Sequence, residues 1–309
     1  MKILITGSAG MVGSCLMKSL SSFPADFEVI GLNRSDVDLT SNPAVLEQLE
    51  HFRPDLIIHA AAVVGGIQAN NDRPLDFLAR NLEIDRNVIL GALSLRIPKL
   101  IYIGSSCMYP KDYRQPLQES DLLMGKLEPT NEGYALAKIV GSKLCEFASK
   151  SKGFVYRTII PSNLYGPGDN FDPTSSHLLA SVIRKVHEAK LTGSKSIEVW
   201  GTGKARREFT YVDDLGRWLA NAVKEIERFP QYLNVGLGKD YSIDEFYSIA
   251  SEVIGVKAEL RHDLTKPDGM HRKLLDSSLA QRTMDWNPKT DIADGVNSTY
   301  QWYLREIDN

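Results

Sequence analysis

The chain has 309 residues, of which 43% are hydrophobic and 24% are charged, and its formal net charge at pH 7 is −3. This length and composition are typical of a globular protein with one sizeable α/β core and a smaller lobe. The near balance of charge argues against nucleic acid or an anionic membrane as a partner.

The first residues enter a strand-like run at once, without the features of a signal peptide, and no apolar run is long enough to span a bilayer. We therefore expect a cytoplasmic protein that is not bound to a membrane. The cysteines Cys15, Cys107 and Cys145 are an odd number without metal-ligand spacing, so the sequence predicts neither a disulfide framework nor a metal site. Cys15 and Cys145 fall in helix-like segments and are expected in the core.

An apolar strand is predicted over residues 2–6, and a glycine-rich turn leads from it into a helix over 11–20. Glycines spaced GxxGxxG allow a tight turn, close approach of a pyrophosphate and close packing of the helix on the strand. The helix N-terminus offers free N–H groups to the phosphates. We therefore predict a dinucleotide site formed by Gly7, Gly10, Met11, Val12 and Gly13.

A second strand over 28–32 ends at Asn33 and Arg34, where a site specific for NAD usually carries an acid. An Asn and an Arg favour a 2′-phosphate, so the predicted cofactor is NADP, used as NADPH. The alternative for Arg34 is a solvated surface charge. Asp38 and Leu39 follow closely and are assigned to the adenine end of the cofactor.

The third strand, 55–59, is followed by Ala60 and Ala61, whose small side chains can line the cofactor, while His59 is expected to be structural. A long helix over 74–96 carries apolar residues on more than one face. One face can cover the sheet, and the other needs a cover within the subunit or from a partner. We therefore predict a homodimer through long helices that include 74–96.

The fourth strand, 99–103, ends in a small-polar turn that contains Ser105 and Cys107. Ligands of open α/β sheets bind at the carboxyl ends of the strands, so this hydroxyl and thiol are candidate catalytic groups. From the residues alone, a polar turn with an incidental buried Cys is an equal alternative.

A helix predicted to begin near Asn131, its possible cap, carries Tyr134 and Lys138. Positions i and i+4 share one helical face, so the ammonium can favour the phenolate and lower the pKa of the tyrosine. An isolated Tyr/Lys pair of this kind usually lies on the protein surface without a function. The preceding dinucleotide turn and Ser105 favour a catalytic role for this pair.

A fifth strand over 153–160 leads into a loop over 161–168 that is too rich in Pro and Gly to continue regular structure. A helix then opens at Ser176-His177, a short strand covers 197–201, and residues 201–214 form a basic loop suited to a diphosphate or simply solvated. We also expect the cofactor to contact residues at the ends of the fourth and fifth strands and beyond: Gly104, Lys138, Pro161, Asn163, Leu164 and His177.

The alternation of strands and helices predicts an α/β protein with a Rossmann-type doubly wound parallel sheet and a smaller C-terminal α/β substrate lobe. We expect residues 1–160 and 202–236 to form the NADP-binding domain. Residues 161–201 and 237–309 are expected to form the lobe that binds the substrate.

Together, the glycine turn, Ser105 and the Tyr134-x-x-x-Lys138 pair resemble the extended short-chain dehydrogenase/reductase family. Within that family the chain is similar to the branch that epimerises and reduces GDP-4-keto-6-deoxy sugars. The motifs of that branch run nearly end to end: Val64-Gly-Gly-Ile67, Gly104-Ser-Ser-Cys-Met-Tyr-Pro110, Leu127-Glu-Pro-Thr-Asn-Glu132, Asn163-Leu-Tyr-Gly-Pro167, Arg207-Glu-Phe209, Lys266-Pro-Asp-Gly269 and Arg272-Lys-Leu-Leu-Asp276.

The resemblance implies that Ser105, Tyr134 and Lys138 form a reductase triad and that Cys107 and His177 form the acid/base pair of the epimerisation. Without it, His177 reads as a helix-start or core histidine. The resemblance also implies a set of residues that bind the GDP-sugar substrate: Lys185, Trp200, Arg207 and Asp268.

Two other functions stay open at this point. The first is an NADPH-dependent C4 reductase, with or without epimerisation, for another GDP-4-keto-deoxy sugar such as a deoxyheptose or a colitose precursor. The second is a redox-sensing dinucleotide binder without catalysis, against which the intact Ser105, Tyr134 and Lys138 set argues.

Overall fold

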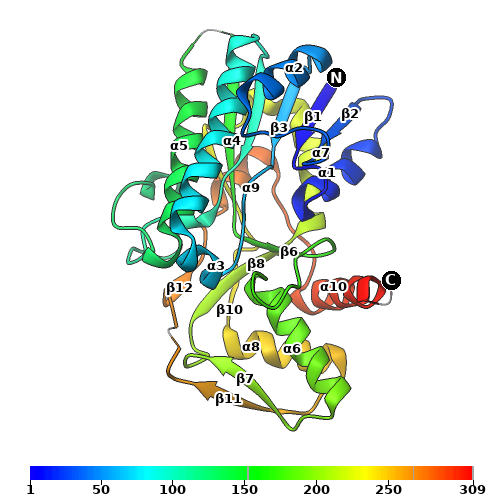
Figure 1. The fold of residues 1–309 in the computed structure, drawn as a ribbon, viewed down its shortest axis with the longest axis vertical. Helices are drawn as coiled ribbons and strands as arrows, with labels where there is room; N and C mark the ends of the chain where they lie inside the picture. The colour runs from blue at the N-terminus through cyan, green and yellow to red at the C-terminus, as the bar shows by residue number, and fades with distance from the viewer. Residues whose placement is uncertain (152, 267, 308–309) are drawn as a thin grey trace.

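The structure is a computed structural model that describes residues 1–151, 153–266 and 268–307. Pro267, part of one of the motifs above, lies outside the described residues. Figure 1 shows a larger part built around the main sheet and, below it, a smaller part that contains α6 (Leu178–Thr192), β7 (Ser196–Trp200), α8 (Ile243–Ile254) and β11 (Glu259–Asp263). The residue boundaries predicted for the two domains stay a prediction.

The main sheet confirms the predicted doubly wound parallel architecture. Every neighbouring pair of its strands is parallel. Its strands lie in the order β2 (Glu28–Leu32), β1 (Lys2–Thr6), β3 (Leu56–His59), β4 (Lys99–Ile103), β5 (Val155–Pro161) and β9 (Tyr232–Val235). The order reverses at β1, which has β2 on one side and β3 on the other, and ligands of such sheets bind outside the carboxyl ends at this point.

Alternate residues of each strand pack on opposite faces of the sheet. In β1, Ile3 and Ile5 join one apolar cluster and Leu4 joins another. Burial on both faces explains why the strands read as continuous apolar runs. One face is covered by α1 (Met11–Ser21), α7 (Val212–Ala222), η4 (Val223–Arg228) and α9 (Ser278–Met284), and the other by α2 (Asn42–Phe52), α4 (Pro74–Ser94) and α5 (Glu132–Ser149).

A second sheet forms where the sequence predicted loops. Its central strand is β8 (Arg206–Tyr211), which pairs with β6 (Asn163–Tyr165), β10 (Asp240–Ser242) and β12 (Arg272–Lys273). The predictions of irregular backbone over 161–168 and of a basic loop over 201–214 are therefore wrong at β6 and β8. These strands are formed by pairing with segments far away in the chain, which no local pattern reveals.

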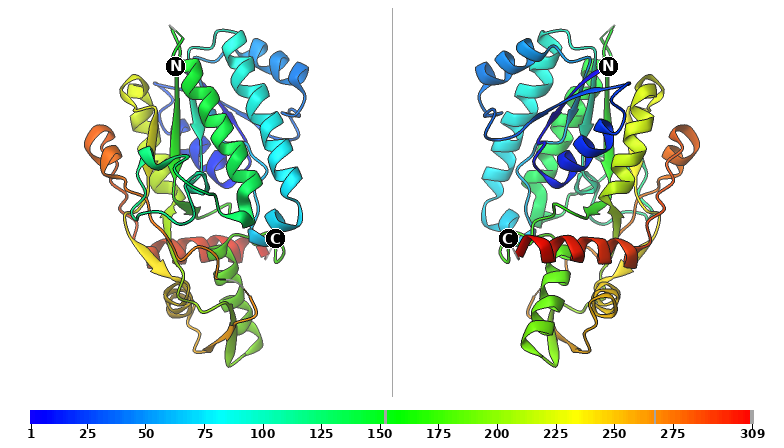
Figure 2. Two further views of the ribbon diagram at one scale, coloured as in Figure 1. Left: turned by 90° about the vertical axis from the view of Figure 1, so that its left-hand side faces the viewer. Right: turned by 90° about the vertical axis from the view of Figure 1, so that its right-hand side faces the viewer.

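The smaller part has an apolar core of its own, in which Leu179 and Ile183 of α6 meet Phe246 of α8. Helix α10 (Ile292–Ile307) contributes Val296 and Tyr300 to this core and crosses the molecule where the larger and smaller parts meet (Figures 1 and 2). The remaining elements are short: α3 (Ile67–Asp72), η1 (Ser106–Met108), η2 (Glu119–Asp121) and η3 (Pro129–Asn131). Within the described ranges, no helix has the length and apolarity needed to cross a membrane.

Helices α4 and α5 run side by side down one face of the molecule (Figure 2). Val88 and Ile89 of α4 are buried against the sheet side. The outer surface of the pair keeps several large apolar side chains exposed: Leu75, Leu90, Leu136, Val140 and Phe147.

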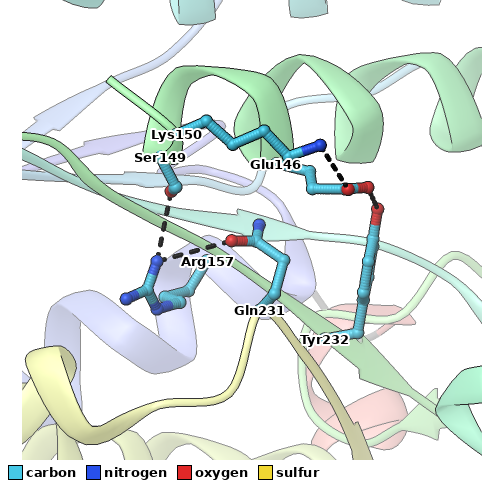
Figure 3. A pocket seen from close by; sticks show the side chains of 6 residues that line it. All are labelled: Glu146, Ser149, Lys150, Arg157, Gln231 and Tyr232. Carbon is cyan, nitrogen blue, oxygen red and sulfur yellow. Dashed lines mark hydrogen bonds and ion pairs between the residues drawn. The ribbon is translucent and has the colours of Figure 1, made fainter. Parts of the chain in front are cut away.

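A hollow at the C-terminal end of α5 is lined by polar side chains that are paired with one another (Figure 3). Tyr232 donates to Glu146 at 2.8 Å, Lys150 lies 3.2 Å from the same carboxylate, and Arg157 donates to Ser149 at 3.1 Å. Arg157 and Tyr232 lie near the amino ends of β5 and β9, at the edge of the sheet opposite the one where ligands bind. These contacts tie α5 to the sheet, and we assign the hollow no site.

Candidate active site

The turn after β4 confirms that the small-polar segment presents its hydroxyl and thiol at the carboxyl edge of the sheet. Ser106 and Met108 are buried, whereas Ser105 and Cys107 are partly exposed. The Ser105 Oγ accepts a hydrogen bond from the Cys107 N–H at 3.2 Å and thereby caps η1. This contact uses only a lone pair of Ser105, so its hydroxyl can also make the hydrogen bond with Tyr134.

Tyr134 and Lys138 lie on α5 beside this turn. The Lys138 side chain is buried, its Nζ donates to the Ile103 carbonyl at 3.1 Å, and it lies 6.0 Å from the centre of the Tyr134 ring. The predicted lowering of the tyrosine pKa by Lys138 is wrong in this structure. Burial raises the pKa of Tyr134, and a hydrogen bond with Ser105 opposes that rise.

Cys107 faces donors that come from two different parts of the chain. Asn131 Nδ2 donates to its Sγ at 3.2 Å, and Lys273 Nζ of β12 lies 3.7 Å from the same sulfur. Asn131 precedes α5 as expected, but its side chain makes no capping hydrogen bond, since the amide is turned toward the thiol. A donor and a cation at this distance stabilise negative charge on sulfur.

His177 occupies the position before the first residue of α6, as the sequence predicted. Its Nδ1 lies 3.6 Å from Oδ1 of Asp169, a buried carboxylate that also accepts the Asn170 N–H at 2.8 Å. The His177 side chain is 40% exposed, so the imidazole is held by Asp169 on one side and open on the other. Among the described residues, the imidazole is paired with Asp169 rather than with Cys107.

The glycine turn has the shape that a dinucleotide needs. Gly7 has φ +73°, and a Cβ there would lie 2.7 Å from the Ala61 Cα. A Cβ on Gly13 would lie 2.0 Å from the Gly7 carbonyl oxygen, so α1 can approach β1 only with glycine at this position. Gly10 leaves the first amides of α1 without a side-chain cap, and Met11 and Val12 form its first turn. These features fit a bound pyrophosphate.

The end of β2 also fits the NADP prediction. Arg34 is exposed, and the side-chain Oδ1 of Asn33 accepts the Ser35 N–H at 2.8 Å. The nearest acid, Asp36, accepts the Asn33 N–H at 2.8 Å and is thus turned back toward the main chain. Asp38 accepts a hydrogen bond from the Thr40 hydroxyl, and this hydrogen bond lowers the pKa of Asp38.

The other predicted cofactor residues gather at the same edge. Ala60 and Ala61 follow β3, and the Ala61 N–H donates to Thr6 Oγ1 at 3.4 Å. Gly104 follows β4, Pro161 ends β5, and Leu164 lies in β6. Asn163 Nδ2 donates to the Glu208 carbonyl at 2.9 Å, so this side chain also links β6 to β8.

The predicted substrate residues fall into two groups. Trp200 is 46% exposed, and the cations of Lys185 and Lys266 lie 5.7 Å and 5.2 Å from the centre of its ring. Arg207 donates to the Met270 carbonyl at 2.5 Å, and Asp268 accepts the Thr202 N–H at 2.6 Å. Burial lowers the pKa of Arg207, and the charges of Glu128, Cys107 and Asp268 oppose that effect.

Local sequence patterns do not identify Asn131, Asp169 and Lys273 as partners of the candidate catalytic groups. Lys273 and Cys107 are 166 positions apart, and only the pairing of β12 with β8 brings them together. Asp169 stands in a Pro/Gly-rich loop, where an acid is easily taken for a turn residue. The motifs that contain Asn131 and Lys273 were the available signal.

Comparison with known proteins agrees with this geometry. A family model described as the NAD dependent epimerase/dehydratase family matches residues 3–236. The chain is 44% identical to a GDP-L-fucose synthase of Azorhizobium caulinodans over 303 residues, which cover 98% of this chain and 96% of the relative. It is 43% identical to a GDP-L-colitose synthase of Yersinia pseudotuberculosis over 310 residues, covering 100% of both chains.

Among solved structures, the chain is similar to a GDP-D-glycero-L-gluco-heptose synthase of Campylobacter jejuni determined in the presence of NADPH. The TM-score is 0.88 and the identity is 30%, over 98% of each chain.

Proposed function

Because the chain belongs to the NAD dependent epimerase/dehydratase family, we propose that it catalyses the reaction of a GDP-L-fucose synthase. GDP-4-keto-6-deoxy-D-mannose is epimerised at C3 and C5 and then reduced at C4 to GDP-L-fucose. The cofactor is NADP, used as NADPH, which agrees with the glycine turn and with Arg34 at the end of β2.

For the epimerisation we assign Cys107 and His177 as base and acid. The hydrogens at C3 and C5 of a 4-keto sugar are acidic because the carbonyl takes up the charge that a departing proton leaves. Cys107 removes such a proton as the thiolate, which Asn131 and Lys273 stabilise, and His177 returns one on the other face of the sugar. Asp169 holds the imidazole.

For the reduction we assign Ser105, Tyr134 and Lys138. NADPH, when bound, supplies the hydride that adds to C4. Tyr134 gives its phenolic proton to the C4 oxygen, and the Ser105 hydroxyl donates a hydrogen bond to the same oxygen. The same two donors stabilise the enolate during epimerisation, so a single oxygen site serves both steps.

The observation that carries this proposal is the turn that holds Ser105 and Cys107 two residues apart. Ser105 is hydrogen-bonded to Tyr134, beside which Lys138 lies, and Cys107 is contacted by Asn131 and Lys273. An enzyme that only reduces the sugar needs Ser105, Tyr134 and Lys138, but not the thiol and its two partners. The test is incubation with GDP-4-keto-6-deoxy-D-mannose and NADPH in deuterated water. Deuterium at C3 and C5 and the L-fuco configuration of the product support the proposal, and unchanged configuration at C3 and C5 refutes the epimerase half.

A second candidate is the NADPH-dependent reduction of another GDP-4-keto-deoxy sugar. The full-length identity of 43% to a GDP-L-colitose synthase favours it. Comparing NADPH consumption across a panel of GDP-4-keto sugars, with a colitose precursor and a deoxyheptose included, separates the two. A kcat/KM for a competing sugar above that for the 6-deoxymannose derivative would replace the first proposal.

We also propose that the protein is a homodimer in the cytoplasm. The exposed apolar side chains on the outer surface of α4 and α5 support a second copy as their cover. Free thiols at Cys15, Cys107 and Cys145 suit a reducing compartment. Sedimentation at micromolar concentration tests the dimer, and a monomer of 34.4 kDa would contradict it.

A further inference from the structure

A buried carboxylate that the mechanism does not use lies behind Lys138. Asp85 of α4 is 1% exposed. It lies in the core between α4, α5 and the sheet, where the surrounding side chains are mainly apolar. Its Oδ1 lies 3.1 Å from His59 Nε2, and its Oδ2 accepts the Tyr102 hydroxyl. A charge in such a place is strongly destabilising unless a cation and hydrogen bonds compensate it.

His59 does not supply that cation. It is fully buried, and burial lowers its pKa, which favours the neutral ring. Its Nδ1 lies 2.7 Å from Thr6 Oγ1. A neutral imidazole with its proton on Nε2 satisfies both contacts, since it donates to Asp85 and accepts from the Thr6 hydroxyl. The imidazole therefore orients the carboxylate without neutralising it.

The cation that can compensate the charge of Asp85 is Lys138. Its Nζ lies 4.6 Å from the centre of the Tyr102 ring, the same ring whose hydroxyl donates to Asp85. Burial lowers the pKa of Lys138, and the charge of Asp85 opposes that effect. Gly141 allows this packing, because a Cβ there would lie 2.5 Å from the Tyr102 hydroxyl and 2.8 Å from Asp85 Oδ2.

Three other titratable groups have pKa values that the charge of Asp85 affects, namely Tyr102, Cys145 and Tyr134, and none of these side chains can carry a positive charge. Burial, and then Asp85 itself, raises the pKa of the Tyr102 hydroxyl and of the Cys145 thiol. In Tyr134, burial is the largest cause of the raised pKa and Asp85 adds to it. Within the described part of the chain, Lys138 is thus the cation of this buried cluster.

We propose that Asp85 is a positioning residue for the reduction: its carboxylate keeps Lys138 charged and, through the Tyr102 ring, holds the ammonium beside Tyr134. The carboxylate also keeps the phenol of Tyr134 protonated, because a nearby negative charge disfavours the phenolate. Asp85 does not touch the substrate. The inference rests on the proposed reduction at C4.

The substitution that tests this is Asp85→Asn, which keeps an oxygen for Tyr102 and removes the charge. Lys138 and Tyr134 should both lose their protons at lower pH, so the alkaline limb of the kcat profile for reduction should move to lower pH. We expect kcat at pH 8 to fall at least ~10-fold, a fraction of the ~10²–10⁴-fold that a positioned proton donor contributes, with KM for the keto sugar changed by less than about threefold. The matched control is Ser142→Ala, a buried residue of α5 whose hydroxyl donates to the Ile139 carbonyl. It should leave the pH profile in place.

A second measurement needs no turnover. In the full-length chain labelled with ¹³Cε-lysine and assigned with Lys138→Arg, the Lys138 signal should titrate at lower pH in Asp85→Asn than in the natural chain. If the natural chain fails to reduce the keto sugar, the proposed function fails while this titration still tests Asp85. A variant that is less stable but keeps the wild-type titration of Lys138 and the wild-type alkaline limb would overturn the proposal.

Should Asp85→Asn fail to fold, the double variant Asp85→Asn/Lys138→Met decides. If the two side chains form a charge pair, the double variant leaves no unpaired buried charge and should be more stable than Asp85→Asn alone. A double variant no more stable than the single one would refute the pairing.

Discussion

The reducing and the epimerising halves of the site are built differently. Tyr134 and Lys138 lie on a long helix packed against the main sheet, and Lys138 is enclosed by the core. Cys107 and His177 lie on a 3₁₀ turn and just before a helix, and their partners Lys273 and Asp169 come from β12 and from the loop after β6. Residues on helices that pack in the core are held more precisely than residues on loops. Epimerisation should therefore depend more strongly than reduction on how the second sheet packs against the main one.

The largest expected effect comes from Tyr134→Phe, which removes the proton donor and leaves the ring in place. Reduction at C4 should fall by ~10³-fold, within the range expected for a general acid. Deuterium exchange at C3 and C5 should fall far less, because Ser105 still donates to the carbonyl oxygen. Single-turnover NADPH consumption and mass spectrometry of the recovered sugar measure the two steps separately. Tyr113→Phe, in an exposed loop, is the matched control, and equal losses in both steps would mean that the two halves are not separable.

The converse change is Cys107→Ser, which replaces the thiolate by a hydroxyl that stays protonated near neutral pH. Exchange at C3 and C5 should fall by at least ~10²-fold, and hydride transfer to a keto sugar that is already epimerised should stay within a few-fold of the natural rate. Cys15→Ser is the control, because burial raises the pKa of that thiol to about 12 and it lies between α1 and α7. Wild-type exchange in Cys107→Ser would exclude Cys107 as the base.

The two halves also differ in how well the sequence predicted them. The glycine turn, the strand ends and the Tyr134/Lys138 spacing are local patterns, and the structure has them where they were expected. Strand β8 was taken for a loop because its partners β6, β10 and β12 are distant in the chain. For the same reason, the local sequence does not show that Lys273 contacts Cys107, which is distant in the chain.

Distance in the chain also hid the support of Lys138. Asp85 lies within the long helix α4, and nothing in the local sequence shows that His59 and Tyr102 converge on it from two neighbouring strands. Side chains that are brought together only by packing leave no periodic signal in the sequence.

Glu208 offers a way to weaken the second sheet without touching the main one. This buried residue of β8 accepts the Gly238 N–H at 2.6 Å and the Leu275 N–H at 2.9 Å, two positions beyond Lys273. Burial raises the pKa of Glu208 to about 7 from its ordinary value of 4.5. The folded state therefore binds more protons than the unfolded state between these values, and stability falls as pH rises through that window.

At ~1.4 kcal/mol per pKa unit, this single group should lower the free energy of unfolding by about 3 kcal/mol between pH 4.5 and pH 7. Urea unfolding at both pH values should show a smaller pH dependence in Glu208→Gln, whose amide does not titrate. Glu225→Gln, an exposed partner of Arg228, should keep the natural dependence. If the free energy of unfolding depends on pH in the same way in the natural chain and in Glu208→Gln, then Glu208 does not carry a proton in the folded state at pH 5.

The smallest effect is expected at the far end of the cofactor, where neither half of the site is involved. Arg34 is exposed and, among the residues that the structure describes, is paired with no acid that would take the place of the 2′-phosphate, since Asp36 is turned toward the Asn33 N–H. Arg34→Ala removes a single charge-assisted contact, so KM for NADPH should rise about tenfold, equivalent to ~1.4 kcal/mol, while KM for NADH stays unchanged. Steady-state kinetics with both cofactors measures this, with Arg228→Ala, an exposed arginine on η4, as the control. Because Arg34 lies on the loop after β2 and, within the described ranges, is bonded to no catalytic side chain, the loss should fall equally on reduction measured with either epimer of the sugar. A selective loss with one epimer would mean that the cofactor end and the sugar end of the site are coupled, and would undo the separation argued above.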